Sequence, residues 1–222
     1  MVPASGLKFD VLPTKTKKAL ERCAALPLFS SPAGWYLAGG TALALQAGHR
    51  QSVDLDFFTP QKSFDEKKLE EALSSAGDWK TDSLGRGTIY GELAGAKISL
   101  IAYPFFKPGA SLIQVGTVSI LTPADIAIMK IVAISQRGKR RDFIDLYWIS
   151  KNVQPLRESV YRVDSQYSVT QNPNHILKSL VYFSDADDDP MPQIFFDATW
   201  DQIKNYFRHE VPVIAKLILR LD

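Results

Sequence analysis

The order of apolar and polar residues predicts a strand, a helix and a second strand near the start of the chain. Residues 35–38 form a short apolar run that stops at Gly39 and Gly40, and residues 41–46 read as a helix, so the two glycines mark a strand-to-helix turn. Residues 52–58 then alternate in polarity with the period of two that is typical of a strand.

The second strand is predicted to show two different faces. Ser52, Asp54 and Asp56 share one face, on which the two carboxylates lie about 7 Å apart from Cα to Cα. That spacing suits one divalent ion or two. The apolar residues between them are expected to point into a core: Val53, Leu55 and Phe57.

The same reasoning predicts the remaining elements. We expect an N-terminal arm over residues 1–13, and a helix over 14–26 with Thr14 or Thr16 as its cap. Further helices are expected over residues 64–76, from the capping signature at 122–125, over 174–183, and over 199–219 with a kink or split near Pro212. Three extended runs, at residues 79–84, 88–93 and 96–103, are expected to form a meander that joins the sheet.

Length and composition indicate a compact globular protein. The 222 residues suit one large domain or a domain with a helical appendage, and 45% hydrophobic with 23% charged residues are ordinary values. A net charge of +2 argues against a strong overall polycation, although a local basic patch is compatible with nucleic acid. Cys23 is the only cysteine, which favours a buried structural thiol and a reducing cytoplasm. We expect no targeting segment and no membrane span, since no stretch approaches ~18 apolar residues.

The glycine turn has the chemistry of a phosphate site. Backbone N–H groups at a helix start are unpaired, the helix dipole favours an anion, and glycine lets a ligand approach the main chain. Thr41 adds a hydroxyl at the same place.

The string GGTALAL, followed by HRQSVDLDFF, resembles the polymerase-β-like nucleotidyltransferase superfamily and, within it, the AbiEii/AbiGii toxin family. The resemblance implies an α+β fold, in which a mixed or antiparallel sheet is flanked by helices and followed by a C-terminal helical part. We expect a nucleotidyltransferase core with its N-terminal arm at residues 1–120 and a helical region packed on it at residues 121–222.

The resemblance also implies roles for individual residues. Asp54 and Asp56 would hold Mg²⁺ or Mn²⁺ on the phosphates of an NTP. The residues expected to bind the nucleotide are Gly39, Gly40, Thr41, Arg50 and Ser52. For Ser52 a simple hydrogen bond to the turn is an equal alternative.

Lys130 is a charged residue within a helix that is otherwise largely apolar, so its position requires an explanation. It is either a lysine whose ammonium reaches water along the helix surface or, as the resemblance implies, a phosphate-binding residue. Asp142 is the candidate for a remaining acidic role, and with Asp145 it forms either a site on one helix face or a surface ion-pair network. The cations at residues 137–141 form a solvated basic turn or a patch for triphosphate or RNA.

Ser99 is a departure from the superfamily pattern, which usually has a third carboxylate on the strand beside Asp-x-Asp. Its presence implies a metal site held mainly by the two aspartates, a ligand from elsewhere, or loss of catalysis.

The resemblance implies a nucleotidyltransferase that transfers a nucleotide from an NTP to RNA, with tRNA favoured, and that has a cognate antitoxin partner. A degenerate nucleotide-binding or interaction module and a nucleotidyltransferase for small hydroxylated compounds such as aminoglycosides are the alternatives.

Overall fold

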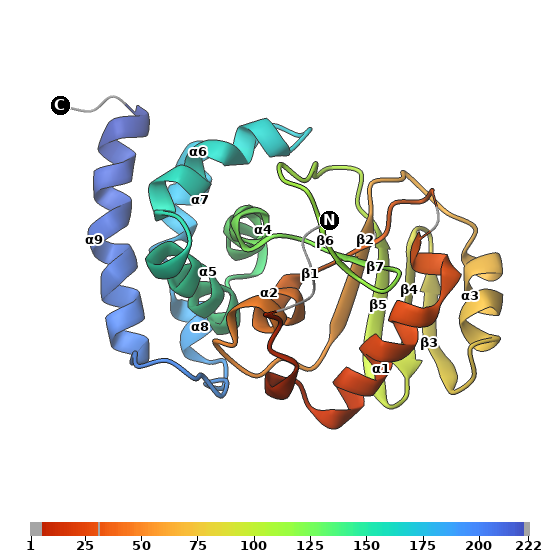
Figure 1. Ribbon diagram of the computed structural model, residues 1–222. Coiled ribbons are helices and arrows are strands. Elements are labelled where there is room, and N and C mark those ends of the chain that lie inside the picture. Colours follow the sequence, from red (N-terminus) through yellow and green to blue (C-terminus); the bar gives the residue numbers. More distant parts are fainter. Residues whose placement is uncertain (1–5, 31, 220–222) are drawn as a thin grey trace. The chain divides into compact units, whose positions relative to one another are not determined.

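The computed structural model describes residues 6–30 and 32–219, which divide into two compact units. The N-terminal unit ends at Thr122 and is built on a β-sheet. The C-terminal unit begins at Pro123 and is built of helices (Figure 1). The first five residues of the predicted arm lie outside the described residues.

The N-terminal unit contains seven strands and three α-helices among its described residues. The strands are β1 (Tyr36–Ala38), β2 (Leu55–Thr59), β3 (Trp79–Gly85), β4 (Thr88–Leu93), β5 (Ala96–Ala102), β6 (Ile113–Val115) and β7 (Val118–Ile120). The helices are α1 (Thr14–Ala25), α2 (Gly39–Ala47) and α3 (Glu66–Ser74), with two 3₁₀ helices, η1 (Phe9–Val11) and η2 (Pro27–Ser30).

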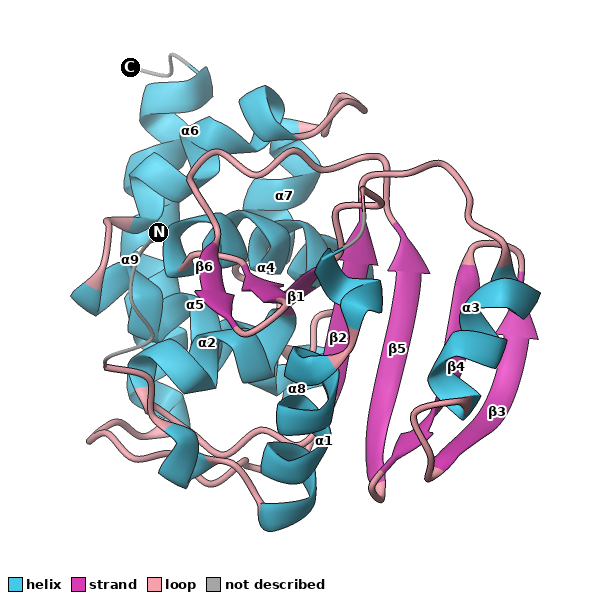
Figure 2. Cartoon of the chain, turned by 45° about the vertical axis from the view of Figure 1, so that its right-hand side comes forward, coloured by secondary structure: helices cyan, strands magenta, loops and turns pink. Residues whose placement is uncertain are grey.

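The strands form one mixed sheet in the order β3-β4-β5-β2-β1-β7-β6. The pairs β2–β5 and β1–β7 are parallel and the other neighbours are antiparallel. The β3–β4–β5 part is the predicted meander, and β5 joins it to β2 (Figure 2). The mixed sheet with its helices confirms the α+β prediction.

One face of the sheet is buried and the other is only partly covered. Leu37, Phe57 and Leu100 are neighbours on adjacent strands and are fully buried. The Phe29 ring of η2 packs on Phe57 with 4.3 Å between centroids. Helix α1 contacts β5 and helix α3 contacts β3 and β4, and Figure 2 shows both helices in front of the sheet. The alternation of buried and half-buried residues along β2, β4 and β5 follows from this arrangement.

The predicted second strand begins later than the sequence pattern indicated. Strand β2 starts at Leu55, and Val53 is 49% exposed, so its assignment to the core was wrong. The reason is that β1 ends at Ala38, where α2 begins, so the residues before Leu55 have no pairing partner on β1. Residues 51–54 lead into β2 outside any helix or strand, and the carbonyls of Val53 and Asp54 accept side-chain hydrogen bonds.

Other differences concern helix ends and short strands. Helix α1 has no side-chain cap, and the Thr16 hydroxyl instead donates a hydrogen bond to the Val53 carbonyl at 2.9 Å. Helix α3 begins after Asp65, whose carboxylate accepts from the Lys68 N–H. Strands β6 and β7 were not predicted because three-residue strands around Gly116 are too short for a clear alternation.

Cys23 is fully buried on α1, as the sequence indicated, and burial raises the pKa of its thiol to about 12. No helix in the described part of the chain combines the length and the apolar character that crossing a membrane requires.

The C-terminal unit is a cluster of helices around an aromatic centre. Its helices are α4 (Pro123–Arg137), α5 (Arg140–Asn152), α6 (Leu156–Gln166), α7 (Pro173–Ser179), α8 (Ser184–Asp187) and α9 (Trp200–Leu219). The buried Phe143 ring contacts the rings of Phe183, Trp200 and Phe207 at 5.1 to 5.9 Å between centroids. Of the predicted kink or split near Pro212, the split is absent, because helix α9 continues through this residue.

Candidate active site

The register of the sheet places Asp56 in the middle of a row of residues on one face. Asp56 pairs with Ala38 of β1 on one side and with Ser99 of β5 on the other, and Ser99 pairs in turn with Tyr90 of β4. Residues paired directly across strands point to the same face. The side chains of Asp56, Ser99 and Tyr90 therefore lie on one face, and the predicted position of Ser99 beside the Asp-x-Asp strand is confirmed.

The two glycines of the turn make room for protein side chains. Gly39 opens α2 with a positive φ of 71°, and a Cβ placed on it would lie 3.2 Å from Asp56 Oδ2. A Cβ on Gly40 would lie 2.2 Å from Nη2 of Arg50 and 3.0 Å from Oγ of Ser52. The sequence assigned the glycines to ligand approach, whereas in the structure they bring a carboxylate and a guanidinium against the main chain.

Thr41 and Ser52 hold the turn to the segment that carries Asp54. The Thr41 hydroxyl donates to the Asp54 carbonyl oxygen at 2.5 Å and lies 2.9 Å from the Ser52 hydroxyl. Thr41 is 1% exposed. The hydrogen bond of Ser52 to the turn, which was one of its two predicted roles, is present.

Arg50 supplies a buried positive charge at the start of α2. Its side chain is 4% exposed, its Nη2 lies close to Gly40, and its Nη1 donates to the Gln51 carbonyl at 2.9 Å. Because a guanidinium stays charged at all relevant pH values, it adds a permanent cation to the positive end of the helix dipole. The Arg50 guanidinium and the helix dipole both favour an anion beside Gly40.

The carboxylates of this site suit a magnesium ion that arrives with a nucleotide. Among the described residues, no group of three or more His, Cys, Asp and Glu side chains is placed to hold a metal ion. Asp54 and Asp56 are half-buried oxygen ligands, and Mg²⁺ is commonly held by one or two carboxylates together with substrate phosphates and water. This donor set therefore fits Mg²⁺ or Mn²⁺ shared with a triphosphate.

The N-terminal unit thus brings together seven of the nine predicted site residues: Gly39, Gly40, Thr41, Arg50, Ser52, Asp54 and Asp56. The other two, Lys130 and Asp142, belong to the C-terminal unit.

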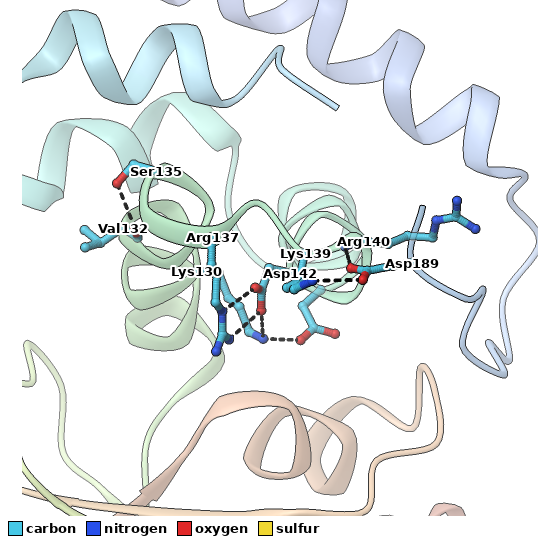
Figure 3. A network of polar contacts seen from close by, with 9 residues as sticks. Lys130, Val132, Ser135, Arg137, Lys139, Arg140, Asp142 and Asp189 are labelled. Carbon is cyan, nitrogen blue, oxygen red and sulfur yellow. Dashed lines mark hydrogen bonds and ion pairs between the residues drawn. The ribbon is translucent and has the colours of Figure 1, made fainter. Parts of the chain in front are cut away.

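A buried ion-pair network joins Lys130, Asp142 and Asp145, and the half-exposed Arg137 also contacts Asp142 (Figure 3). The Lys130 ammonium lies 2.7 Å from a carboxylate oxygen of Asp142 and 2.7 Å from one of Asp145. The Lys130 side chain is 6% exposed and both carboxylates are fully buried. A lysine with its ammonium in water and a surface ion-pair network, the two structural alternatives from the sequence, are therefore both excluded.

Arg137 is the residue of this network that the sequence did not assign. Its Nε donates to Asp142 at 3.1 Å across the break at Gly138, where φ is 51°. The signal was present, because an arginine at the last turn of one helix and an aspartate in the first turn of the next face each other across a short turn.

The pKa of the Asp142 carboxyl is lowered despite its burial. Burial alone raises this pKa, but the positive charges of Lys130 and Arg137, which also donate hydrogen bonds to the carboxylate, more than offset that effect. Asp142 is therefore a carboxylate at neutral pH, with its charge balanced inside the C-terminal unit.

The rest of the basic turn is tied to the acidic segment before α9. Lys139 lies 3.1 Å from Asp189, and the Arg140 backbone N–H donates to the same carboxylate at 2.9 Å. The Arg140 guanidinium donates to the carbonyls of Ala186 and Asp187. These contacts give the turn and the acidic segment a shared structural role.

The chain is similar to one protein-family model and to several known proteins. A family model described as nucleotidyl transferase AbiEii toxin, Type IV TA system, matches residues 22–94 and 97–215. An uncharacterized protein of Aquifex aeolicus (strain VF5) is 33% identical over 210 residues, which is 90% of this chain and 96% of that protein. Among solved structures, JHP933 from Helicobacter pylori aligns with a TM-score of 0.51 at 16% identity and covers 94% of this chain and 95% of that one. The nucleotidyltransferase toxin MenT4 of Mycobacterium tuberculosis H37Rv aligns with a TM-score of 0.43 at 15% identity, covering 93% and 95%.

The mixed sheet flanked by helices has the fold of JHP933, and the family model that matches most of the chain is one of nucleotidyltransferases. The family model spans most of the chain, and the Aquifex relative matches over nearly its whole length. The chain belongs to the AbiEii family of nucleotidyltransferase toxins, as the resemblance implied.

Replacing Gly40 by alanine tests whether this glycine is needed for Arg50. Gly40 is not in the left-handed region, so the new Cβ acts mainly by displacing the guanidinium and to a smaller extent by crowding the Ser52 hydroxyl. We expect a loss of about 1–3 kcal/mol in the free energy of unfolding. In an Arg50→Ala background the same substitution should cost much less. Urea unfolding of the four proteins measures both values, and an equal cost in the two backgrounds would show that Arg50 is not what Gly40 accommodates.

Asp142→Asn should weaken the C-terminal unit and change its response to acid. Removing one partner of a buried ion pair costs about 3–5 kcal/mol. Because the folded-state pKa of Asp142 lies below its unfolded value of about 3.9, its contribution is fully present above that pH and is lost as the pH falls through the lowered pKa. The unfolding free energy of the wild type should therefore fall more steeply than that of the variant as the pH is lowered from about 5 to about 3.

Asp188→Asn is the matched control for this experiment, because Asp188 is an exposed carboxylate of the same unit. Its variant should keep the acid response of the wild type. Identical pH profiles for the wild type and Asp142→Asn would contradict the network.

Proposed function

We propose that this nucleotidyltransferase is Mg²⁺-dependent and transfers a nucleotide from an NTP to an RNA acceptor, with tRNA favoured. The observation that supports the proposal best is the position of the Asp56 carboxylate against the glycine turn, next to the buried Arg50 guanidinium. Negative ligands for a metal and a positive site for phosphate lie side by side there. A triphosphate that carries Mg²⁺ presents the complementary charges.

The transfer forms one bond and breaks one. An acceptor hydroxyl oxygen attacks the α-phosphorus, the bond from this phosphorus to the oxygen that bridges to the β-phosphate breaks, and pyrophosphate leaves with the electron pair. The hydroxyl proton passes to water or to a nearby base. Asp54 and Asp56 would hold Mg²⁺ or Mn²⁺, which would supply positive charge against the phosphates.

The residues around the turn bind and orient the triphosphate in this proposal. The first N–H groups of α2 have no partner within the helix and point toward an anion at Gly39 and Gly40. Arg50 adds its charge without a change of protonation. Thr41 and Ser52 keep the Asp54 segment fixed relative to the turn through their hydrogen bonds, and Ser52 is in addition a candidate phosphate contact.

Lys130 and Asp142 remain candidates for the catalytic residues in the C-terminal unit. The contacts within that unit support a positioning role, since the Lys130 ammonium is already held by two carboxylates. To contact a phosphate directly, the Lys130 ammonium would have to give up one of these two ion pairs. Activity measurements on Lys130→Met therefore need the unfolding free energy measured on the same sample.

The partners in the proposal follow from the family. The name of the family model refers to a toxin–antitoxin system, and we propose a cognate antitoxin as the macromolecular partner. The single, buried cysteine supports a reducing cytoplasm as the place of action.

Ser99 is the observation that favours a second candidate. It lies directly beside Asp56, where the superfamily pattern has a third carboxylate, and a module that binds nucleotide without turnover would need no such group. A transferase that modifies small hydroxylated compounds is the other alternative, distinguished only by its acceptor.

Substituting the paired aspartates tests the proposal. Asp54→Asn and Asp56→Asn should each lower label transfer from an α-labelled NTP in Mg²⁺ by more than roughly a hundredfold, which is the upper range for indirect effects at metal sites. Total RNA, total protein and a small-molecule fraction serve as separate acceptors. Asp82→Asn, which removes an exposed carboxylate from β3, should leave the transfer unchanged.

Three results would count against the proposal. If label transfer is unchanged in both aspartate variants, Asp54 and Asp56 do not hold a metal ion that the reaction needs. NTP binding without pyrophosphate release in the wild type supports the degenerate module. If label is found only in the small-molecule fraction, the acceptor is a small molecule and not RNA.

Adding a carboxylate at Ser99 should strengthen the metal site. Because Ser99 pairs with Asp56 on the same face, Ser99→Asp places a third oxygen ligand beside the pair, and we expect the Mg²⁺ concentration for half-maximal transfer to fall on the order of tenfold. Ser83→Asp is the control, since it adds the same charge to the same row on β3, two strands away. An equal change in the two variants would mean that general surface charge, not the position, decides metal binding.

A further inference from the structure

We propose that a row of aromatic rings beside Asp56 forms a stacking site for a nucleobase. The aromatic row consists of Tyr36, Phe58, Tyr103 and Phe105, all in the N-terminal unit. The inference rests on the proposed nucleotidyl transfer and adds to it the place where a base of the substrate is held. No ring of this row was singled out from the sequence.

The register fixes where the row begins. Phe58 follows Asp56 by two residues on β2, so both side chains point to the same face, with their Cα atoms about 7 Å apart. Tyr36 of β1 is the direct partner of Phe58. The row therefore starts one strand repeat from the metal-binding carboxylate, on the side away from the glycine turn.

The rings form a continuous series from the sheet to the surface. Tyr36 is 1% exposed and stacks on Phe58 with 6.1 Å between centroids. Tyr103 contacts Phe58 edge to face at 5.6 Å and contacts Phe105 in the same way at 5.6 Å. Phe105 is 46% exposed. The inner rings hold the outer rings in fixed orientations, which lowers the entropy lost when a planar ligand stacks on them.

This face of the sheet is the less covered of the two. The residues that alternate with the row, such as Phe57 and Leu100, lie fully buried on the opposite face, where α1 and α3 pack. On the face of the row, Tyr90 is 41% exposed and Phe58 and Tyr103 are half-buried. Large aromatic surface is thus kept accessible next to polar groups.

A nucleobase fits this surface better than a purely apolar ligand does. A ligand that extends from the Asp56 carboxylate along the row must carry phosphate at one end and a flat ring at the other. A nucleotide has this form, with its base one ribose away from the phosphate. Aromatic side chains bind every base through its π-face, so the row gives affinity without requiring one base.

Phe105→Ala tests the proposal because this exposed ring is not needed for the core. With Mg²⁺ present, calorimetry compares ATP with inorganic tripolyphosphate, which has the phosphates but no base. The variant should bind ATP on the order of tenfold more weakly, whereas its affinity for tripolyphosphate should not change. Phe105→Trp, which keeps a stacking ring, should retain the affinity of the wild type for ATP.

Two controls and a second ligand complete the experiment. Leu84→Ala removes an equally exposed apolar side chain from the opposite face of the same sheet and should change neither affinity. A short single-stranded RNA replaces ATP in a parallel titration. A loss confined to ATP assigns the stacked base to the NTP, and a loss confined to RNA assigns it to the acceptor.

The proposal is overturned if Phe105→Ala binds both ATP and RNA as tightly as the wild type does. That result leaves the transferase proposal intact. A failure of the transferase proposal has a different signature, because Asp54→Asn would then weaken the binding of neither ATP nor tripolyphosphate.

Discussion

The register of β2 between β1 and β5 is the constraint on which the site depends. A slip of one residue would exchange the two faces of the strand, and would bring Asp56 into the core in place of the fully buried Leu55 and Phe57. The burial of the hydrophobic face of β2 therefore holds the Asp56 carboxylate in position, although the buried residues themselves lie on the opposite face from the candidate site. The same register sets Asp56 beside Gly39, beside Ser99, and one repeat from Phe58.

The C-terminal unit is organised by a different interaction, the burial of opposite charges. Lys130 balances Asp142 and Asp145 within a helical core, and the half-exposed Arg137 contacts Asp142 as well. Such a network adds little net stability over an apolar core, but it penalises any arrangement that leaves one charge unpaired. It thereby fixes α4 against α5 with one set of contacts. Lys130 and Asp142, which we propose as site residues, thus also contribute to the packing of this unit.

Most of the fold could be predicted from the sequence, and so could part of the candidate site. The glycine turn, the Asp-x-Asp strand and the meander are local patterns. The place of Ser99 beside Asp56 was implied by the resemblance to the superfamily, and the register agrees with it. The end of β1 could not be predicted, so Val53 was assigned to the core. The partners of Lys130 and the space that Arg50 occupies beside Gly40 depend on packing between segments, which periodicity does not encode.

In the proposed site, Asp54 and Asp56 hold a divalent ion together with a nucleotide. Equilibrium dialysis with Mn²⁺ and an NTP measures it directly, by counting the metal and the nucleotide that the protein retains. The wild type should retain both together, and Asp56→Asn should lose the Mn²⁺ while unfolding at the same urea concentration. Equal retention of Mn²⁺ by the wild type and by Asp56→Asn would contradict the claim.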